Sequence, residues 1–192
     1  MAREKITNWK TLKRKYILRD RWLTVSKNQC LLPNKKIIDD FYLLKRPNWA
    51  VVFAVTDKNE VVLVEQYKYG VDKIIWELPA GAIDQIDKSP VAGARRELAE
   101  ETGYGGGRWF FLGQWFCEPS GQDNLVYAYL ALGVKKIGKQ KLDPAENIKV
   151  RFCRLAKIKA LVKSNKIKTQ GHVAAVYKGL EKIDSDFLST KK

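Results

Sequence analysis

The clearest element in the sequence is a helix between Ser89 and Gly103. Serine favours the N-cap position, the following Pro90 suits the first helical position, and glycine is a common residue just past a helix C-terminus. Within these limits three acidic residues follow the spacing i, i+3 and i+4, which places them on one face of a helix: Glu97, Glu100 and Glu101. The sequence therefore predicts a helix that carries three clustered carboxylates.

Clustered like charges destabilise a helix by a few tenths of a kcal/mol per pair, about 0.2–0.5. A bound cation compensates for this repulsion, and a site with oxygen ligands only favours Mg²⁺, with Mn²⁺ as the alternative. The competing interpretation is a solvated acidic face whose ion-pair partners are Arg95 and Arg96. For this spacing alone the acidic face is the better interpretation. The context favours the metal site, because the segment Trp76–Gly81 predicts a strand that runs into a glycine turn, and a loop then leads to the helix.

The rest of the chain alternates between strand and helix patterns. The β-branched runs 49–55 and 61–67 flank the turn residues 57–60, which predicts a hairpin. Further strands are expected over the ranges 17–25, 37–44, 109–117, 124–134 and 150–155, and further helices over 156–163 and 171–183. The fold class is thus mixed, α/β or α+β, with short helices and a separate antiparallel piece at the N-terminus.

Composition limits the class of protein further. The chain has 192 residues, 45% of them hydrophobic, so it can bury the core of one domain with a small appendage. No apolar stretch approaches the roughly 18 residues of a membrane span, and the charged N-terminus does not predict a secretory signal. Cys30, Cys117 and Cys153 lack metal-site or disulfide spacing. We expect a soluble cytoplasmic protein whose net charge of +15 attracts polyanions.

The glycine turn and the acidic helix together resemble the box of the Nudix hydrolase family. That box reads G, five residues, E, seven residues, then REUxEExGU, where U is apolar. Residues 96–104 (RELAEETGY) match its second half, with Tyr104 as the apolar residue. The first half departs from the pattern, because the interval from Gly81 to Arg96 is one residue longer and Asp87 or Lys88 stands where the first Glu is expected.

The resemblance implies a fold and an assembly. A mixed sheet between helices is expected, with residues 46–192 forming the Nudix hydrolase domain. Residues 1–45 would form an N-terminal β segment that is exchanged across a homodimer and contributes to the partner's substrate site.

The resemblance also implies a metal site and a mechanism. Glu97 and Glu101 would be the principal ligands, with Glu100 as a further ligand or an activator of water, and the carbonyl of Ala80 would complete the site. Arg96 lies i, i+4 from Glu100 and can hold its carboxylate. For the general base, Glu146 in the loop before a strand is the candidate, although an ordinary loop acid is an equal interpretation. The single histidine, His172, is expected to be structural or to face solvent.

Substrate residues are implied by similarity to the ADP-ribose and nucleoside diphosphate sugar branch of the family. Lys68 stands where that branch places a phosphate-binding arginine, and Pro119 follows the box at the distance typical of ADP-ribose hydrolases, although Asn124 replaces the usual acid there. Trp22 and Phe41 would sandwich the base and Arg46 would contact the substrate, whereas the competing interpretation places both aromatic residues in a core or interface.

These features predict hydrolysis of the pyrophosphate bond of ADP-ribose or a related nucleoside diphosphate sugar. Two alternatives stay open. The high positive charge suits a Nudix enzyme that acts on RNA 5′ ends or dinucleoside polyphosphates, but the lysines are scattered and no RNA-binding motif accompanies them. The altered first half of the box suits a nucleotide-binding module without catalysis, but Glu97, Glu100 and Glu101 are all intact.

Overall fold

The computed structural model describes the backbone of residues 5–189 and the side chains of residues 5–185. The chain divides into two compact units. The first comprises Met1–Pro47 together with Phe116–Asn124, and the second comprises Asn48–Trp115 and Leu125–Lys192. No helix in the described part of the chain is long and apolar enough to cross a membrane.

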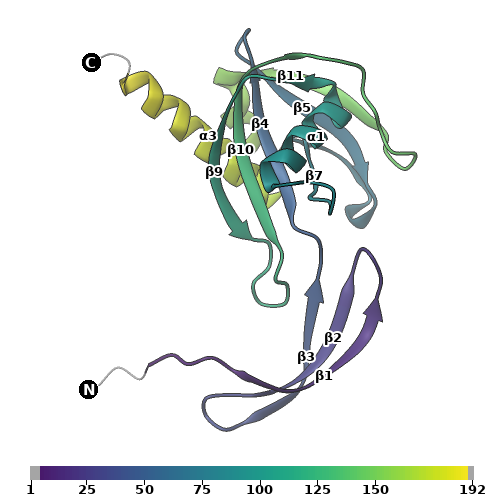
Figure 1. The fold of residues 1–192 in the computed structure, drawn as a ribbon. Helices are drawn as coiled ribbons and strands as arrows, with labels where there is room; N and C mark the ends of the chain where they lie inside the picture. Colours follow the sequence, from purple (N-terminus) through teal and green to yellow (C-terminus); the bar gives the residue numbers. More distant parts are fainter. Residues whose placement is uncertain (1–4, 190–192) are drawn as a thin grey trace. The chain divides into compact units, whose positions relative to one another are not determined.

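The first unit is built on a three-stranded antiparallel sheet (Figure 1). Its strands, in the order in which they pair, are β1 (Lys10–Arg19), β2 (Thr24–Leu31) and β3 (Ile37–Lys45). The strand predicted over residues 17–25 is wrong, because Asp20 ends β1. Its side-chain Oδ1 accepts hydrogen bonds from the backbone N–H groups of Trp22 (2.7 Å) and Leu23 (2.8 Å). Such a turn is typical of aspartate, and it outweighs the strand propensity of its neighbours.

The strands of this first unit leave many apolar side chains exposed. Every residue of β1 is exposed, whereas β2 alternates and buries Ser26, Asn28 and Cys30 on one face. Large apolar side chains with about half or more of their surface in solvent belong to Trp9, Leu12, Tyr16, Ile17, Leu18, Trp22, Ile37 and Tyr42. Exposed apolar surface of this extent is typical of an interaction surface.

The second unit is a mixed sheet with helices on both faces (Figure 1). Its strands run in the order β11 (Ile148–Arg154), β5 (Glu60–Lys68), β4 (Trp49–Thr56), β10 (Leu125–Lys136) and β8 (Tyr104–Gly105). β6 (Lys73–Glu77) pairs with β5, β7 (Ala80–Ala82) with β4, and β9 (Arg108–Phe116) with β10. β4 and β10 are parallel, whereas β4 and β5 form the predicted hairpin.

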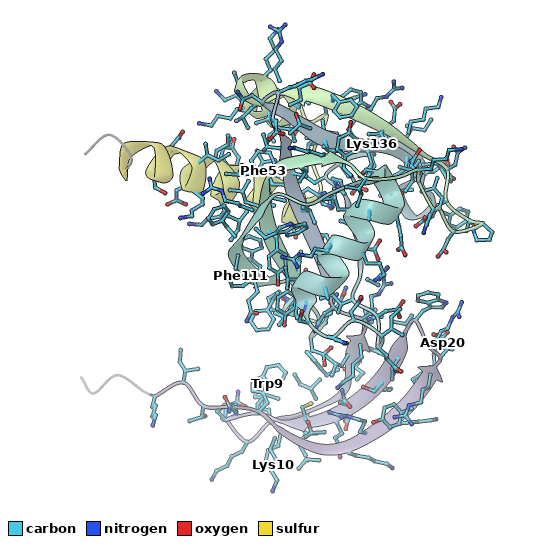
Figure 2. All side chains as sticks on the ribbon, turned by 45° about the horizontal axis from the view of Figure 1, so that its top comes forward. Trp9, Lys10, Asp20, Phe53, Phe111 and Lys136 are labelled. Atoms are coloured by element: carbon cyan, nitrogen blue, oxygen red, sulfur yellow. The ribbon has the colours of Figure 1, made fainter. Side chains whose placement is uncertain are left out.

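The central strand β4 is buried on both faces. Ala50, Val52 and Ala54 pack in the core that includes Leu98 of helix α1 (Pro90–Thr102). Phe53, labelled in Figure 2, lies on the opposite face, because side chains alternate along a strand. It packs against Gly179 of helix α3 (Gln170–Ser189). The predicted mixed sheet between helices is therefore confirmed.

Most of the predicted elements of this second unit are present within a few residues of their expected limits. The helix predicted over 156–163 is a short 3-10 turn, Leu155–Lys157, that continues into α2 (Ile158–Lys163). A second 3-10 turn, Tyr69–Val71, joins β5 to β6. The short strands β7 and β8 carry too few residues to show a period in the sequence, and pairing with β4 and β10 defines them.

Candidate active site

Helix α1, which carries the three carboxylates, has a well-defined start and a well-defined end. Ser89 has an extended backbone, and its hydroxyl accepts a hydrogen bond from the N–H of Ala92 at 3.3 Å. Gly103 adopts the left-handed conformation with φ of 69°, and its N–H donates to the carbonyl of Ala99 at 2.8 Å. Because Leu98 on the apolar stripe is fully buried against the sheet, the rotation of the helix about its axis is fixed.

Strand β7 brings the backbone of Ala80 to the end of this helix. β7 pairs with β4 through Val51 opposite Ala80, and the N–H of Ala80 donates a 2.9 Å hydrogen bond to Oε2 of Glu101. The side chain of Glu101 is buried, with 3% of the residue's surface exposed. Ala80 in the turn and Glu101 on the acidic helix, 21 residues apart in the sequence, thus form one site.

Gly81 makes room for the second carboxylate. A Cβ atom on Gly81 would overlap the carboxylate of Glu97. Glycine is therefore required at this position by the close approach of the helix side chain to the β7 backbone, and any other residue would displace Glu97.

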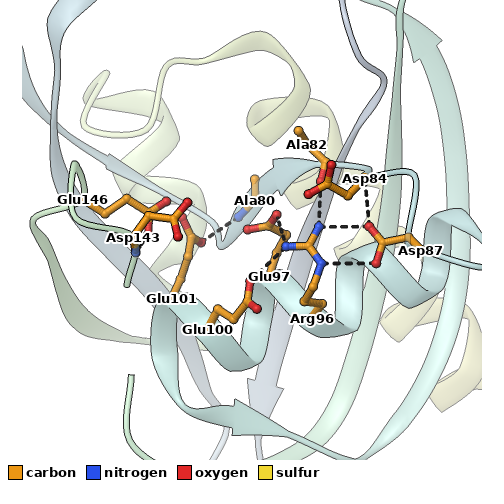
Figure 3. A network of polar contacts seen from close by, with 10 residues as sticks. All are labelled: Ala80, Ala82, Asp84, Asp87, Arg96, Glu97, Glu100, Glu101, Asp143 and Glu146. Carbon is orange, nitrogen blue, oxygen red and sulfur yellow. Dashed lines mark hydrogen bonds and ion pairs between the residues drawn. The ribbon is translucent and has the colours of Figure 1, made fainter. Parts of the chain in front are cut away.

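Arg96 is the centre of the polar network drawn in Figure 3. Its Nη1 donates to Oε1 of Glu97 at 2.8 Å and to Oε2 of Glu100 at 2.9 Å. Its Nη2 donates to the carbonyl of Ala82 at 2.9 Å and to Oδ2 of Asp87 at 2.9 Å. A planar guanidinium with five donors can hold several oxygens at fixed angles, so Arg96 orients two of the three carboxylates.

Asp87 completes this network, and the sequence alone did not assign it this role. Besides the bond from Nη2, it accepts a 3.2 Å hydrogen bond from Nε of Arg96 through Oδ1. The bond from Arg96 holds the pKa of the Asp87 carboxyl below its usual range. Gly81 to Asp87 preserves the family interval, so the extra residue of the box lies between Asp87 and Arg96. The count from Gly81 is the signal that could have identified Asp87.

The two inner carboxyls of the cluster carry a large electrostatic cost. Burial raises the pKa of Glu97 to about 7, against the opposing effect of Arg96. Burial raises the pKa of Glu101 to about 8, and the Ala80 N–H only partly offsets this. Glu146 adds to both increases. Groups of this kind, charged in water and desolvated together in the fold, are typical of sites that receive a cation.

The oxygen donors of this cluster fit a hard divalent ion. In the described part of the chain, no three or more His, Cys, Asp or Glu side chains converge on one point as a preformed metal site. Carboxylates are nevertheless the ligands that Mg²⁺ and Mn²⁺ prefer, and burial, which raises the pKa of Glu97 and Glu101, makes their charged forms costly unless a cation compensates for the lost solvation.

Glu146 lies in the loop before β11, beside the same cluster (Figure 3). Its Oε2 accepts a 3.0 Å hydrogen bond from the N–H of Asp143, and its own N–H donates to the Asp143 carbonyl at 2.9 Å. Because its charge raises the pKa of Glu97 and Glu101, the loop brings this carboxylate within electrostatic range of the helix. Its role as a base stays a prediction.

Lys68, at the end of β5, belongs to the same unit. Its Nζ lies 3.4 Å from Oε2 of Glu77, a carboxylate that is almost completely buried. Nearly half of the Lys68 side chain is exposed, and its charge lowers the pKa of Glu101 by a smaller amount than burial raises it. A partly exposed cation near the carboxylates suits the predicted contact with phosphate.

The other predicted substrate residues belong to the first unit. Trp22 lies in the turn between β1 and β2, and the guanidinium of Arg21 covers its ring at 4.3 Å. Phe41 lies on β3, with the ring of Trp9 packed edge-on at 5.5 Å. Arg46, which follows β3, is exposed, and so is Pro119 in the segment Phe116–Asn124. Their roles stay predictions.

Comparison with known proteins gives two family matches that together cover most of the chain. The family described as "NUDIX domain" matches residues 44–173, and that described as "Nucleoside diphosphate sugar hydrolase N-terminal domain" matches residues 9–44. A "Methanol dehydrogenase activator" of Bacillus methanolicus is 30% identical over 90% of this chain and 92% of its own length. An "ADP-ribose pyrophosphatase" of Bacillus subtilis (strain 168) is 28% identical over 82% and 85%, respectively.

A solved structure shares the fold. "Crystal structure of ADP compounds hydrolase" covers 95% of this chain and 98% of its own, with a TM-score of 0.85 and 20% sequence identity. The NUDIX match spans most of the chain and includes the glycine turn, Asp87, Arg96 and the three glutamates of α1. The chain therefore belongs to the Nudix family and is a hydrolase.

Proposed function

We propose that this hydrolase uses Mg²⁺ to cleave the pyrophosphate bond of ADP-ribose or a related nucleoside diphosphate sugar, giving a nucleoside monophosphate and a sugar phosphate. Relatives from Bacillus subtilis and Mycobacterium tuberculosis carry the name ADP-ribose pyrophosphatase. The match of residues 9–44 to the N-terminal domain of nucleoside diphosphate sugar hydrolases supports the same substrate class.

The observation that carries the proposal is the pair of desolvated carboxyls next to β7. Glu97 fills the space above Gly81, Glu101 accepts from the Ala80 N–H, and burial raises the pKa of both carboxyls. Glu97, Glu100, Glu101 and the carbonyl of Ala80 would hold the metal. When bound, the ion neutralises diphosphate charge and makes water more acidic.

The protein's own groups have distinct tasks in this scheme. Arg96 keeps Glu97 and Glu100 in place through its Nη1 atom. Glu146 takes the proton from the attacking water, whose oxygen forms a bond to phosphorus as the bond from phosphorus to the bridging oxygen breaks. The bridging oxygen leaves with one of the two phosphates. Lys68 binds the diphosphate of the substrate.

The first unit would provide the nucleotide-recognition part of the site. We propose that residues 1–45 are exchanged across a homodimer, and that residues 46–192 form the catalytic domain. In the dimer Trp22 and Phe41 would stack on the base, with Arg46 and Pro119 contacting the rest of the substrate. The half-exposed apolar side chains of the first unit support a partner at this surface.

A substrate panel tests the proposal. Purified protein with Mg²⁺ is incubated with ADP-ribose, GDP-mannose, ADP-glucose, UDP-glucose, diadenosine polyphosphates and capped or 5′-triphosphorylated RNA, and the products are separated by chromatography. Release of AMP and ribose 5-phosphate from ADP-ribose, lost in Glu101→Gln, is the expected result. Faster hydrolysis of RNA than of any nucleotide sugar would show that RNA 5′ ends, and not nucleoside diphosphate sugars, are the substrate. If none of these compounds is hydrolysed, the protein would be a nucleotide-binding module without catalysis.

A further inference from the structure

The connection between β6 and β7 carries the backbone of Ala80 to the carboxylate cluster. It consists of Leu78 and Pro79, and the side chain of Leu78 is fully buried. The carbonyl of Pro79 accepts a 2.9 Å hydrogen bond from the N–H of Val52 on β4. The position of Ala80 therefore depends on how these two preceding residues are held.

His172 of helix α3 holds the first of them. Its Nδ1 accepts a hydrogen bond from the N–H of Leu78 at 3.1 Å, between residues 94 apart in the sequence. Both partners are buried, so the N–H of Leu78 has no access to water, and the loss of this acceptor would leave it unsatisfied.

The hydrogen bond also defines the protonation of the ring. Because Nδ1 accepts, the ring proton is on Nε2, which lies 3.4 Å from Oε1 of Glu77. Burial lowers the pKa of His172 to about 4, so the ring is neutral at pH 7 and Nδ1 remains free to accept. The contact with Glu77 is thus one between a carboxylate and a neutral ring, which fixes the ring's orientation.

Glu77 is itself held from two sides. Its Oε1 accepts from the hydroxyl of Thr169 at 2.8 Å, and its Oε2 accepts from the side-chain amide of Gln66 at 3.3 Å. Lys68 lies 3.4 Å from the same Oε2. One carboxylate therefore connects the start of α3 to the cation on β5.

The ring of His172 has little freedom to move. It packs on Trp49 of β4 with ring centroids 5.5 Å apart. Gly171, the residue before it, allows this approach, because a Cβ there would lie 2.8 Å from the Trp49 ring. The first turn of α3 is therefore fitted closely against the strand that also pairs with β7.

We infer that His172 is a positioning residue for the reaction, which acts through the N–H of Leu78 to place the backbone of Ala80 at the carboxylate cluster. Glu77 aligns the imidazole and at the same time restrains Lys68. This assignment rests on the proposed function for its effect on turnover, but its effect on the Leu78–Ala80 backbone is independent of the substrate.

Two substitutions test the contacts of Nδ1 and Nε2 separately. In His172→Asn the side-chain oxygen stands as many bonds from Cα as Nδ1 does and can accept from Leu78. In His172→Gln the side-chain nitrogen can reach Glu77, as Nε2 does, whereas the amide oxygen stands one bond farther from Cα than Nδ1 does and is displaced from the N–H of Leu78. We expect kcat for His172→Asn to stay within about threefold of the parent, and kcat for His172→Gln to fall roughly 100-fold, since small errors in placement cost rates of this order.

Two measurements on the full-length protein do not depend on turnover. Hydrogen–deuterium exchange of the peptide that contains Leu78 and Ala80 should be faster in His172→Gln than in the parent or His172→Asn. Calorimetric titration with Mn²⁺ should show about tenfold weaker binding in His172→Gln alone. Lys178→Ala, on an exposed part of the same helix, is the matched control and should change neither quantity.

The outcomes distinguish the inference from the proposed function. Unchanged exchange at Leu78 in His172→Gln would overturn the positioning role, and so would equal kcat losses in the Asn and Gln variants at equal folded fraction. If no nucleotide is hydrolysed by the parent protein, the proposed function fails, while the exchange and Mn²⁺ results still decide the role of His172. Should His172→Gln not fold, Thr169→Val loosens Glu77 instead, and faster exchange at Leu78 is again expected.

Discussion

Asp87 and Arg96 are joined by two hydrogen bonds, from Nε to Oδ1 at 3.2 Å and from Nη2 to Oδ2 at 2.9 Å. The side chain of Asp87 is buried and that of Arg96 is about one-fifth exposed. The loop with the unusual spacing is thereby tied to the residue that orients Glu97 and Glu100. In this chain an aspartate performs the anchoring, with one more residue before the arginine.

Replacement of Asp87 should release Arg96 and with it the carboxylates of Glu97 and Glu100. For Asp87→Asn we expect a loss of about 1.5–3 kcal/mol in the free energy of unfolding, since hydrogen bonds to charged groups contribute roughly this amount, and a fall in kcat of tenfold or more. Chemical denaturation and steady-state kinetics measure the two effects. Asp84→Asn is the control, because Asp84 enters the network through its backbone N–H. Equal effects of both substitutions would contradict the anchoring role.

Gly81→Ala should separate activity from stability. The added methyl group would overlap the carboxylate of Glu97, which is the end of a flexible side chain and can turn away. We therefore expect turnover to fall at least about 100-fold through misplaced ligands, with a change below roughly 1.5 kcal/mol in the free energy of unfolding. Gly70→Ala is the control, since a Cβ at Gly70 meets no atom within 4 Å. Retained activity in Gly81→Ala would place the metal ligands elsewhere.

The stability of the metal-free protein should fall as pH rises from about 6.5 to 8. The folded-state pKa of Glu97 is about 7 and that of Glu101 about 8, both above the ordinary value of 4.5. The native state therefore holds protons that the unfolded chain has already lost, and this stabilisation disappears as pH rises through the folded-state values. His172, with a pKa lowered to about 4, has the opposite effect only below about pH 6.5.

Thermal unfolding measured across this pH range checks the sign. A loss of 1 kcal/mol corresponds to a shift of about 2–4 °C in Tm for a domain of this size. Glu101→Gln should flatten the profile, and Mg²⁺ should stabilise the parent protein more at pH 8 than at pH 6.5, because a larger fraction of both carboxyls is ionised and able to bind it. A profile that rises between pH 6.5 and 8 would show that the two carboxyls are ionised at lower pH than the structure implies.

Glu146→Gln should lower kcat by about 100-fold or more while KM changes little, because general bases contribute 10²–10⁴-fold. Asp143→Asn tests the neighbouring carboxylate of the loop, whose backbone rather than side chain bonds to Glu146. A large loss in Asp143→Asn with normal activity in Glu146→Gln would reassign the base.

Deletion of residues 1–44 tests the proposed assembly. Light scattering should give about twice the chain mass for the full-length protein and the monomer mass for the deletion variant, and the deletion should abolish turnover of ADP-ribose. Leu18→Glu, a single change on the exposed β1, should weaken the dimer without removing the segment. A full-length monomer that is active would contradict the exchange.

The parts of the site that could be predicted from the sequence are those encoded by local spacing. The start at Ser89, the end at Gly103 and the i, i+3, i+4 spacing of the glutamates follow from helix geometry. The hydrogen bond from Ala80 to Glu101 required the pairing of β7 with β4, because three residues show no period of their own. The contact of His172 with Leu78 spans 94 residues and has no local signal at all.

Where the sequence misleads about strand limits or motif spacing, the cause is also local. The range 17–25 reads as one strand because aromatic and branched residues surround Asp20, yet a single side-chain oxygen at that position reverses the chain. From the sequence alone, the longer interval between Gly81 and Arg96 suggests that the first half of the box is lost. The hydrogen bond from Arg96 to Asp87 shows instead that Asp87 takes part in the network. In both cases the hydrogen bonds of one aspartate side chain explain the difference.

The charge pattern of β1 has a consequence for solubility. This strand forms one border of its sheet, and half of its ten residues are cations, namely Lys10, Lys13, Arg14, Lys15 and Arg19. An uncovered strand border can recruit further chains without limit, and repulsion between rows of lysine and arginine opposes such open-ended growth. Part of the large positive charge of the chain thus protects it from fibrillar aggregation while its apolar side chains remain available to a single partner.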